Sequence, residues 1–200
     1  MSLVYVANLL ANPPSGWARI HADNRSVPRV FFTHTMLFAL VPAVCGYIGT
    51  TRTGWQVGAG NLIKLTEGSA ALMACAYYAA MLVGALSVGW VIRWMSRTYG
   101  VDQPAGQCLA LASFSATPLF LVGAVQLYPV LWLNLVAGLP ALALTTYLFY
   151  RGVPVMMEVT RDRGFLFATA VMGFGLVALV AMLAVTVLLW ASGFAPQFTH

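Results

Sequence analysis

The chain contains 200 residues, of which 60% are hydrophobic and 8% are charged, and its formal net charge is +5. A soluble domain carries roughly 25% charged residues, so these few charges cannot cover a water-facing surface, and an ordinary soluble protein is excluded. The basic residues lie between long apolar runs and form no continuous stripe, which excludes nucleic acid as an expected partner. Anionic lipid headgroups are the expected counter-charge.

Residues 1–29 are too polar to cross a bilayer, although several apolar residues near the start fit one face of a helix. These residues are Leu3, Val4, Val6, Ala7, Leu10 and Ala11. A helix with one apolar face lies along a membrane surface. The sequence therefore predicts a cytoplasmic amino-terminal segment over residues 1–29 with an interfacial amphipathic helix. A disordered tail is the alternative, because chain ends fray unless other residues hold them.

Five apolar runs follow, and each is long enough to span a bilayer, which takes about 20 apolar residues in a helix. They cover approximately residues 30–50, 68–92, 106–126, 129–150 and 167–191. The predicted fold class is all-α, a polytopic membrane protein whose residues 30–200 form a domain of five transmembrane helices. Leu127 and Tyr128 alone separate the third and fourth runs, which predicts an antiparallel hairpin. Pro129 is expected in the first turn of the fourth helix. Backbone N–H groups there have no acceptor within the helix, so the missing N–H of proline costs no hydrogen bond.

The distribution of lysine and arginine predicts the orientation of these spans, because cytoplasmic segments next to transmembrane helices retain basic residues. Arg52 and Lys64 fall on one side of the predicted membrane. The other eight basic residues fall on the side of the amino terminus: Arg19, Arg25, Arg29, Arg93, Arg97, Arg151, Arg161 and Arg163. We therefore expect the amino terminus in the cytoplasm and the carboxyl terminus outside.

Three of the runs contain an internal proline, which removes a helix hydrogen bond and tends to kink the segment. These residues are Pro42, Pro118 and Pro140. Ser115 and Thr117 lie beside Pro118, and their hydroxyls can bond the carbonyl groups that a kink frees. The pattern predicts a structural kink in the third helix. The alternative is a kinked, hydroxyl-lined helix that borders a cavity.

His34 is the one ionisable residue inside a predicted run, about one turn from its cytoplasmic end. A histidine there can titrate near neutral pH, but a side chain bonded to headgroups or water is the favoured interpretation. The sequence contains no His-Glu-x-x-His, Gly-x-Ser-x-Gly or glycine-rich phosphate loop. Its histidines are predicted at different depths or sides. No catalytic residue, metal site or cofactor is predicted.

The third run contains Ser115-Ala116-Thr117-Pro118, which resembles a pattern of the Yip domain family, the Ypt-interacting-protein type of five-helix membrane proteins. Further similarities are Asn12-Pro13 followed by Trp17, Tyr128-Pro129, Tyr147, Tyr150 and Gly152, and the stretches Cys45 to Trp55 and Ala116 to Trp132. The last two resemble a bacterial branch, and the resemblance spans nearly the whole chain. It implies five helices in the bacterial inner (plasma) membrane with a cytoplasmic amino terminus. Because Tyr150 is among the residues that resemble the family, it is a candidate functional position.

Eukaryotic relatives in that family are linked to small GTPases of the Rab type and to vesicle traffic. They carry a longer cytosolic amino-terminal region, and the Asp-Leu-Tyr-Gly-Pro motif of some is absent here. GTPase binding is therefore not expected.

The leading hypothesis for function is a non-enzymatic membrane protein that organises lipid or partner proteins. Short loops, missing catalytic motifs and helix faces of small residues favour it, and the expected partners are membrane lipids, a homo-oligomer or other membrane proteins. The first alternative is a channel or facilitator for a small solute, based on Pro118 and its neighbouring hydroxyls. An intramembrane enzyme is the second alternative, and a cluster of paired polar side chains at mid-depth would indicate it.

Overall fold

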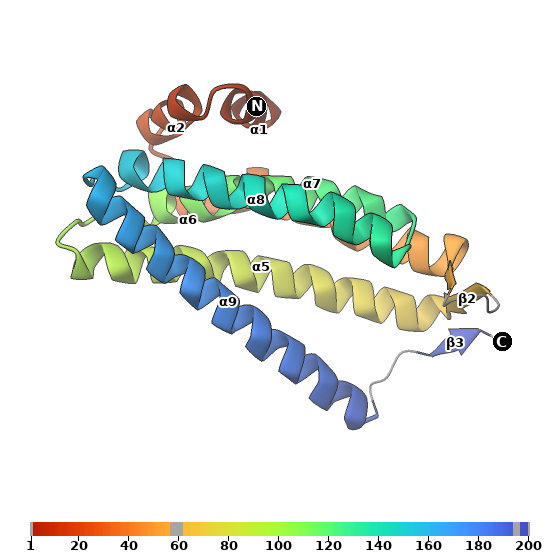
Figure 1. Cartoon of the computed structure of the whole chain (residues 1–200). Helices are drawn as coiled ribbons and strands as arrows, with labels where there is room; N and C mark the ends of the chain where they lie inside the picture. The colour runs from red at the N-terminus through yellow and green to blue at the C-terminus, as the bar shows by residue number, and fades with distance from the viewer. Residues whose placement is uncertain (1, 57–61, 194–196, 200) are drawn as a thin grey trace.

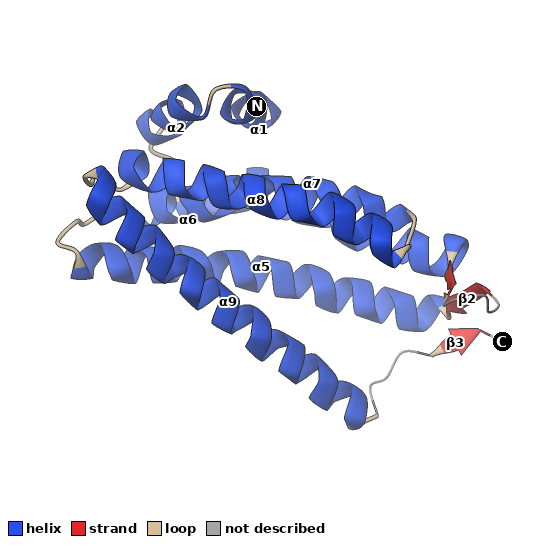
Figure 2. Ribbon diagram, viewed as in Figure 1, coloured by secondary structure: helices blue, strands red, loops and turns tan. Residues whose placement is uncertain are grey.

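The computed structural model describes residues 2–56, 62–193 and 197–199. Long helices run side by side in a bundle, and short strands lie at one end of it (Figures 1 and 2). Four described helices are long and apolar enough to cross a membrane, and a bent pair of helices makes a possible fifth. The all-α membrane class predicted from the sequence is confirmed at this level.

The first apolar run forms one continuous helix over Val27–Thr53. Its hydrogen bonding changes along its length, which gives four consecutive elements: α3 (Val27–Val30), η1 (Phe31–Thr35), α4 (Met36–Ile48) and η2 (Gly49–Thr53). Both η1 and η2 are π-helical. Pro42 lies inside α4 and is buried against η3 of the third run, where a Cβ on Gly123 would meet the Pro42 Cβ at 2.3 Å. The glycine therefore permits the close approach of these two helices.

The third run is broken into α6 (Ala105–Ser115), α7 (Thr117–Val122) and the 3₁₀-helix η3 (Gly123–Leu127). The segments before and after Ala116 are bent by 40°. Pro118 explains the break, because it has no N–H to bond the preceding turn. The predicted kink is therefore present.

The hairpin predicted between the third and fourth runs is confirmed, because α6 and α7 pack along α8 (Leu131–Met156). The prediction for Pro129 is wrong, since α8 begins two residues later at Leu131. The Val130 N–H bonds the Tyr128 carbonyl across Pro129 at 2.7 Å. Asn134 Nδ2 then donates to the same carbonyl at 3.1 Å. This tight turn, and not the first turn of the helix, uses the fixed φ of proline.

The second and fifth runs form the longest helices, α5 (Glu67–Thr98) and α9 (Arg161–Ala191). Both extend beyond the predicted runs at the ends that carry arginine. A hydropathy window detects only the apolar residues that must lie in the hydrocarbon. The helix continues beyond them, because its backbone hydrogen bonds do not end where the apolar residues do. Figure 1 shows α9 close to the other helices at its start and diverging from α5 toward its end.

Three short strands were not predicted: β1 (Trp55–Gln56), β2 (Leu62–Leu65) and β3 (Phe198–Thr199). They pair antiparallel in the order β1-β2-β3, with Trp55 opposite Ile63 and Lys64 opposite Thr199. The sheet ties the carboxyl end of the chain to the connection between the first and second spans.

Residues 2–22 form two helices, α1 (Ser2–Ala11) and α2 (Pro13–Ala22), in place of the disordered tail considered above. The Asn12 side chain caps α2 through the Ser15 N–H. The two helices cross tightly, because a Cβ on Gly16 would lie 2.6 Å from the Leu9 Cα. In Figure 1, this helical hairpin lies against the side of the bundle near the end where α5 finishes and α9 begins.

The buried core lies where this hairpin meets the bundle. Its largest fully buried side chains come from α1, α2, α5, α6, α8 and the start of α9, and they include Trp17, Leu9, Ile20, Ile92, Leu111, Phe114, Leu148 and Phe167. Most exposed apolar side chains lie on α5, α8 and α9. This distribution fits a bundle with a solid core at one end and hydrocarbon around the rest.

Candidate functional site

The buried polar contacts connect the first span to the broken third helix. His34, in η1, is 0% exposed, and its ring stacks on Phe114 of α6 with 3.9 Å between ring centroids. Its Nε2 lies 3.0 Å from Thr117 Oγ1. The interpretation of His34 as a residue bonded to headgroups or water is therefore wrong. The reason is that the bend at Ala116 brings α6 and α7 across the face of η1 that carries the imidazole.

A second hydroxyl pair lies beside this histidine. Thr35 Oγ1 is 2.8 Å from Ser113 Oγ, and the Thr117 hydroxyl donates to the Ser113 carbonyl at 3.3 Å. The imidazole tautomer sets which of Thr117 and His34 Nε2 donates in their hydrogen bond. The other ring nitrogen, Nδ1, is buried and has no partner among the described residues.

These contacts define what we call the His34 cluster: His34, Thr35, Ser113 and Thr117. It contains two of the predicted site residues, and Pro118 supplies the bend beside it. Ser115 is also buried, but its hydroxyl has no partner in the described part of the chain. The cluster holds two spans together through neutral hydrogen bonds. Its chemistry is that of a helix contact, because no described carboxylate or thiol bonds the imidazole.

The remaining predicted site residues lie elsewhere. Pro42 packs on η3, and Pro129 lies in the turn before α8. Tyr150 joins α8 to α9, because its hydroxyl is 2.9 Å from Thr169 Oγ1 and its ring lies 5.4 Å from that of Phe165.

Trp17 anchors the amino-terminal hairpin on the bundle. Its side chain is 0% exposed, and its indole N–H donates to the Leu148 carbonyl of α8 at 3.1 Å. Gly152, one turn further along α8, leaves the space for the ring, because a Cβ there would meet Trp17 Cε2 at 2.6 Å. Sequence analysis noted Trp17 and Gly152 in the family pattern but did not predict that they meet.

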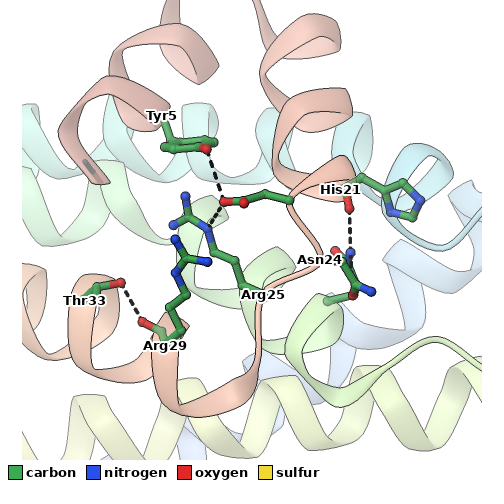
Figure 3. Close-up of polar contacts among 8 residues, drawn as sticks. Tyr5, His21, Asn24, Arg25, Arg29 and Thr33 are labelled. Atoms are coloured by element: carbon green, nitrogen blue, oxygen red, sulfur yellow. Dashed lines mark hydrogen bonds and ion pairs between the residues drawn. The ribbon is translucent and has the colours of Figure 1, made fainter.

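A charged contact lies where the hairpin joins the first span. Arg25 is 6% exposed, and its guanidinium pairs with Asp23 and lies 4.1 Å from the centre of the Tyr5 ring. The Tyr5 hydroxyl donates to Asp23 Oδ2 at 3.1 Å. The hydrogen bond from Arg25 holds the pKa of the Asp23 carboxyl below its ordinary value. Figure 3 shows Tyr5 of α1 and Arg25 of the connection between α2 and α3 converging there, with Arg29 extending beside Arg25.

Two further contacts fix the same corner. Gln107 Nε2 of α6 donates to the His21 carbonyl at 2.8 Å and to Asn24 Oδ1 at 3.3 Å. His21 Nε2 lies 3.0 Å from Glu158, in the connection between α8 and α9. Figure 3 shows His21 and Asn24 on the chain that leaves the hairpin. Closely spaced Asp23 and Arg25 were the sequence signal for this corner, but charges near a terminus are usually solvated.

The described residues include no group of three or more histidine, cysteine, aspartate or glutamate side chains placed to hold a metal ion. Two grooves on the described surface are apolar. One lies between α5 and α9 and the other between α4 and α5.

Comparison with known proteins gives one family and close bacterial relatives. A family model described as the Yip1 domain matches residues 7–182. Inner membrane protein YohC of Escherichia coli strain K12 is 35% identical over 190 residues, which are 95% of this chain and 97% of the relative. Inner membrane protein YohC of Escherichia coli O6:H1 strain CFT073 matches with the same identity and coverage. No solved structure matches the chain.

These matches confirm the family predicted from the Ser115-to-Pro118 pattern and its companions. They also confirm the predicted location, so the protein is a multi-pass protein of the bacterial inner membrane. The chain belongs to the Yip1 domain family.

Proposed function

We propose that this protein is a non-enzymatic membrane protein that organises lipids or partner proteins. The observation that carries the proposal is the apolar surface of its outer spans. In the most apolar part of α5 none of the residues is buried inside the protein, and in α9 6% are, compared with 33% in the first span. One side of α5 packs along α4 and α6, so it is the exposed faces of α5 and α9 that have their contacts with lipid, with a second copy or with another membrane protein.

We further propose five crossings, with the bent α6–α7–η3 segment as one of them, the amino terminus inside and the carboxyl terminus outside. Supporting this orientation, the arginine-rich ends of α5 and α9 lie at the same end of the bundle as the amino-terminal hairpin (Figure 1). Reporter tags at the two chain ends test it. Tags in the same compartment would contradict the topology.

Residues 1–29 form the cytoplasmic segment of this proposal, and residues 30–200 form the transmembrane domain. In α1, Val6 and Leu9 are buried while a second apolar stripe stays exposed: Leu3, Val4, Ala7, Leu10 and Ala11. At 100° per residue these five side chains occupy one side of the helix. An exposed apolar stripe next to basic residues supports contact with the inner membrane surface.

The proposal is preferred to a channel because the third-helix hydroxyls of Ser113, Ser115 and Thr117 are buried, and those of Ser113 and Thr117 are hydrogen-bonded. Ser113 and Thr117 bond Thr35 and His34, and Phe114 covers the imidazole. A water-filled path would need such groups to face an open passage. Flux measurements with reconstituted liposomes test the point, and we expect no solute or ion movement above that of empty vesicles.

The test of the main proposal is photo-crosslinking in native membranes at Val180, which is exposed in α9. Val136, equally exposed in α8, is the matched control. We expect protein adducts at Val180 that exceed those at Val136, and a complex that survives mild detergent. An isolated monomer that crosslinks to no protein and copurifies lipids in the proportions of the surrounding membrane would contradict it.

A further inference from the structure

The groove between α5 and α9 has the composition of a lipid-binding surface. It measures about 440 Å³, and its lining includes Trp90, Trp94, Met95, Tyr99, Ala170 and Phe174. Ligand sites in proteins measure roughly 300–1,000 Å³. The large aromatic side chains are not packed away, since Trp90 is 68% exposed and Trp94 is 60% exposed. Tryptophan with an exposed ring is typical of the level where headgroups meet hydrocarbon.

The groove is closed at one end and open at the other. At the end nearer the loop between α5 and α6, the rings of Tyr99 and Phe167 meet edge to face, with 5.5 Å between their centroids. In the other direction α9 diverges from α5 (Figure 1). An acyl chain can therefore enter from the surrounding hydrocarbon and lie along the groove with its polar end near the Tyr99 level.

Arginines lie near this closed end. At 100° per residue, Arg163 shares one face of α9 with Ala170 and Phe174, whereas Arg161 lies on the opposite face. On α5, Arg97 is adjacent to Trp90 and Trp94 on the helix surface. The Arg97 side chain is 58% exposed, and its ion pair with Asp102 is long, at 3.5 Å, and open to solvent. Such a pair is weak, so the guanidinium can bond a phosphate.

We propose that the α5–α9 groove binds an anionic phospholipid, with an acyl chain against Trp94 and Ala170 and the phosphate near Arg97 and Arg163. The proposal rests on the lipid-organising function above and names the class of lipid. Basic side chains near a membrane surface each contribute about a fivefold preference for anionic lipid. Arg97 and Arg163 together therefore contribute about 25-fold.

The experiment uses the full chain in phosphatidylcholine vesicles that contain increasing fractions of phosphatidylglycerol with brominated acyl chains. Bromine in contact with an indole quenches its fluorescence, and the Trp94 contribution is the difference from the Trp94→Phe variant. We expect half-maximal quenching of Trp94 at a much lower fraction of brominated phosphatidylglycerol than of brominated phosphatidylcholine. Equal quenching by the two lipids would overturn the proposal.

Paired variants separate the groove from general membrane contact. Arg97→Gln with Arg163→Gln should remove most of the preference, while Arg161→Gln, which removes a charge from the opposite face of α9, should keep it. Ala170→Phe fills the groove and should reduce Trp94 quenching by both lipids. Ala181→Phe places the same ring on the same face of α9 beyond the groove and should not. Quenching that is insensitive to Ala170→Phe would overturn the proposal.

Failure of this proposal is distinguishable from failure of the general function. A protein that crosslinks through Val180 but shows equal quenching by both lipids organises partners without an anionic-lipid groove. Protein adducts from a photo-crosslinker placed at Trp94 would show a second chain in the groove, which also contradicts the lipid proposal.

Discussion

The contact between α2 and α8 differs from the contact between α9 and the rest of the bundle in the kind of side chain that makes it. Trp17 inserts a large ring into a space kept by Gly152 and donates a hydrogen bond to Leu148. Beyond Val171, most large apolar side chains of α9 are exposed, and glycines such as Gly173 and Gly175 have open space beside them.

This difference shows that one apolar composition serves two purposes in the molecule. Close packing within the chain holds the hairpin, the first span, α6 and the inner part of α8 in one arrangement. The greater part of α9 is free to make contacts with lipid or another protein. The predictions below compare the same substitution in the two regions.

The largest difference in stability loss between the two regions is expected for the substitution of tryptophan by alanine. Trp17→Ala leaves a cavity and removes the indole hydrogen bond to the Leu148 carbonyl, so we expect it to lower the free energy of unfolding by about 3–5 kcal/mol. Trp190→Ala in α9, where the ring is 46% exposed, should cost under about 1 kcal/mol. Chemical unfolding in detergent micelles measures both. Equal losses would contradict the comparison.

Glycine should show the next largest difference. A methyl group at Gly152 must displace the Trp17 ring or Leu111, so Gly152→Ala is expected to destabilise by about 1–3 kcal/mol. Gly173→Ala has nothing within 4 Å of the new atom and should leave stability unchanged within about 0.5 kcal/mol. Thermal unfolding followed by circular dichroism compares them. A neutral Gly152→Ala would show that α2 does not sit as tightly on α8 as described.

Threonine tests the His34 cluster. Thr117→Val removes the hydroxyl that bonds His34 Nε2, and hydrogen bonds between membrane helices contribute about 0.6 kcal/mol on average and up to about 1.7 kcal/mol. Thr186→Val in α9 removes a hydroxyl that bonds only its own helix at Met182, and we expect no measurable change. Chemical unfolding of both variants measures the cost, with His34→Ala added to Thr117→Val as a double-mutant cycle. A coupling energy of zero would count against the contact.

The smallest change in stability is expected on lowering the pH. The pKa of Asp23 is lower in the folded protein because Arg25 donates a hydrogen bond to the carboxylate. Such a group contributes stability that is complete above its unfolded pKa of about 4 and is lost as the pH falls through the folded pKa. We expect the wild type to lose under about 1 kcal/mol below pH ~4, since the pair is partly exposed. Unfolding of Asp23→Asn should show a flatter acid dependence, and Tyr5→Phe an intermediate one.

Local composition was enough to locate the spans. Every predicted run overlaps a described apolar helix, because hydrocarbon rejects exposed peptide groups whatever the neighbouring helices are. The pattern around Pro118 also predicted a bend, since a proline removes a hydrogen bond from its own helix. The family followed from residues spread along the chain, and the match over residues 7–182 agrees with it.

Only the tertiary structure decided which side chains meet. Trp17 and Leu148 are 131 positions apart, and His34 and Thr117 are 83 apart, so no window of sequence contains both partners. The exposed stripe of α1 and the short strand at Phe198 likewise depend on what packs beside them. Hydropathy is a property of each residue and its near neighbours in the sequence. Burial depends on packing against residues that are distant in the sequence.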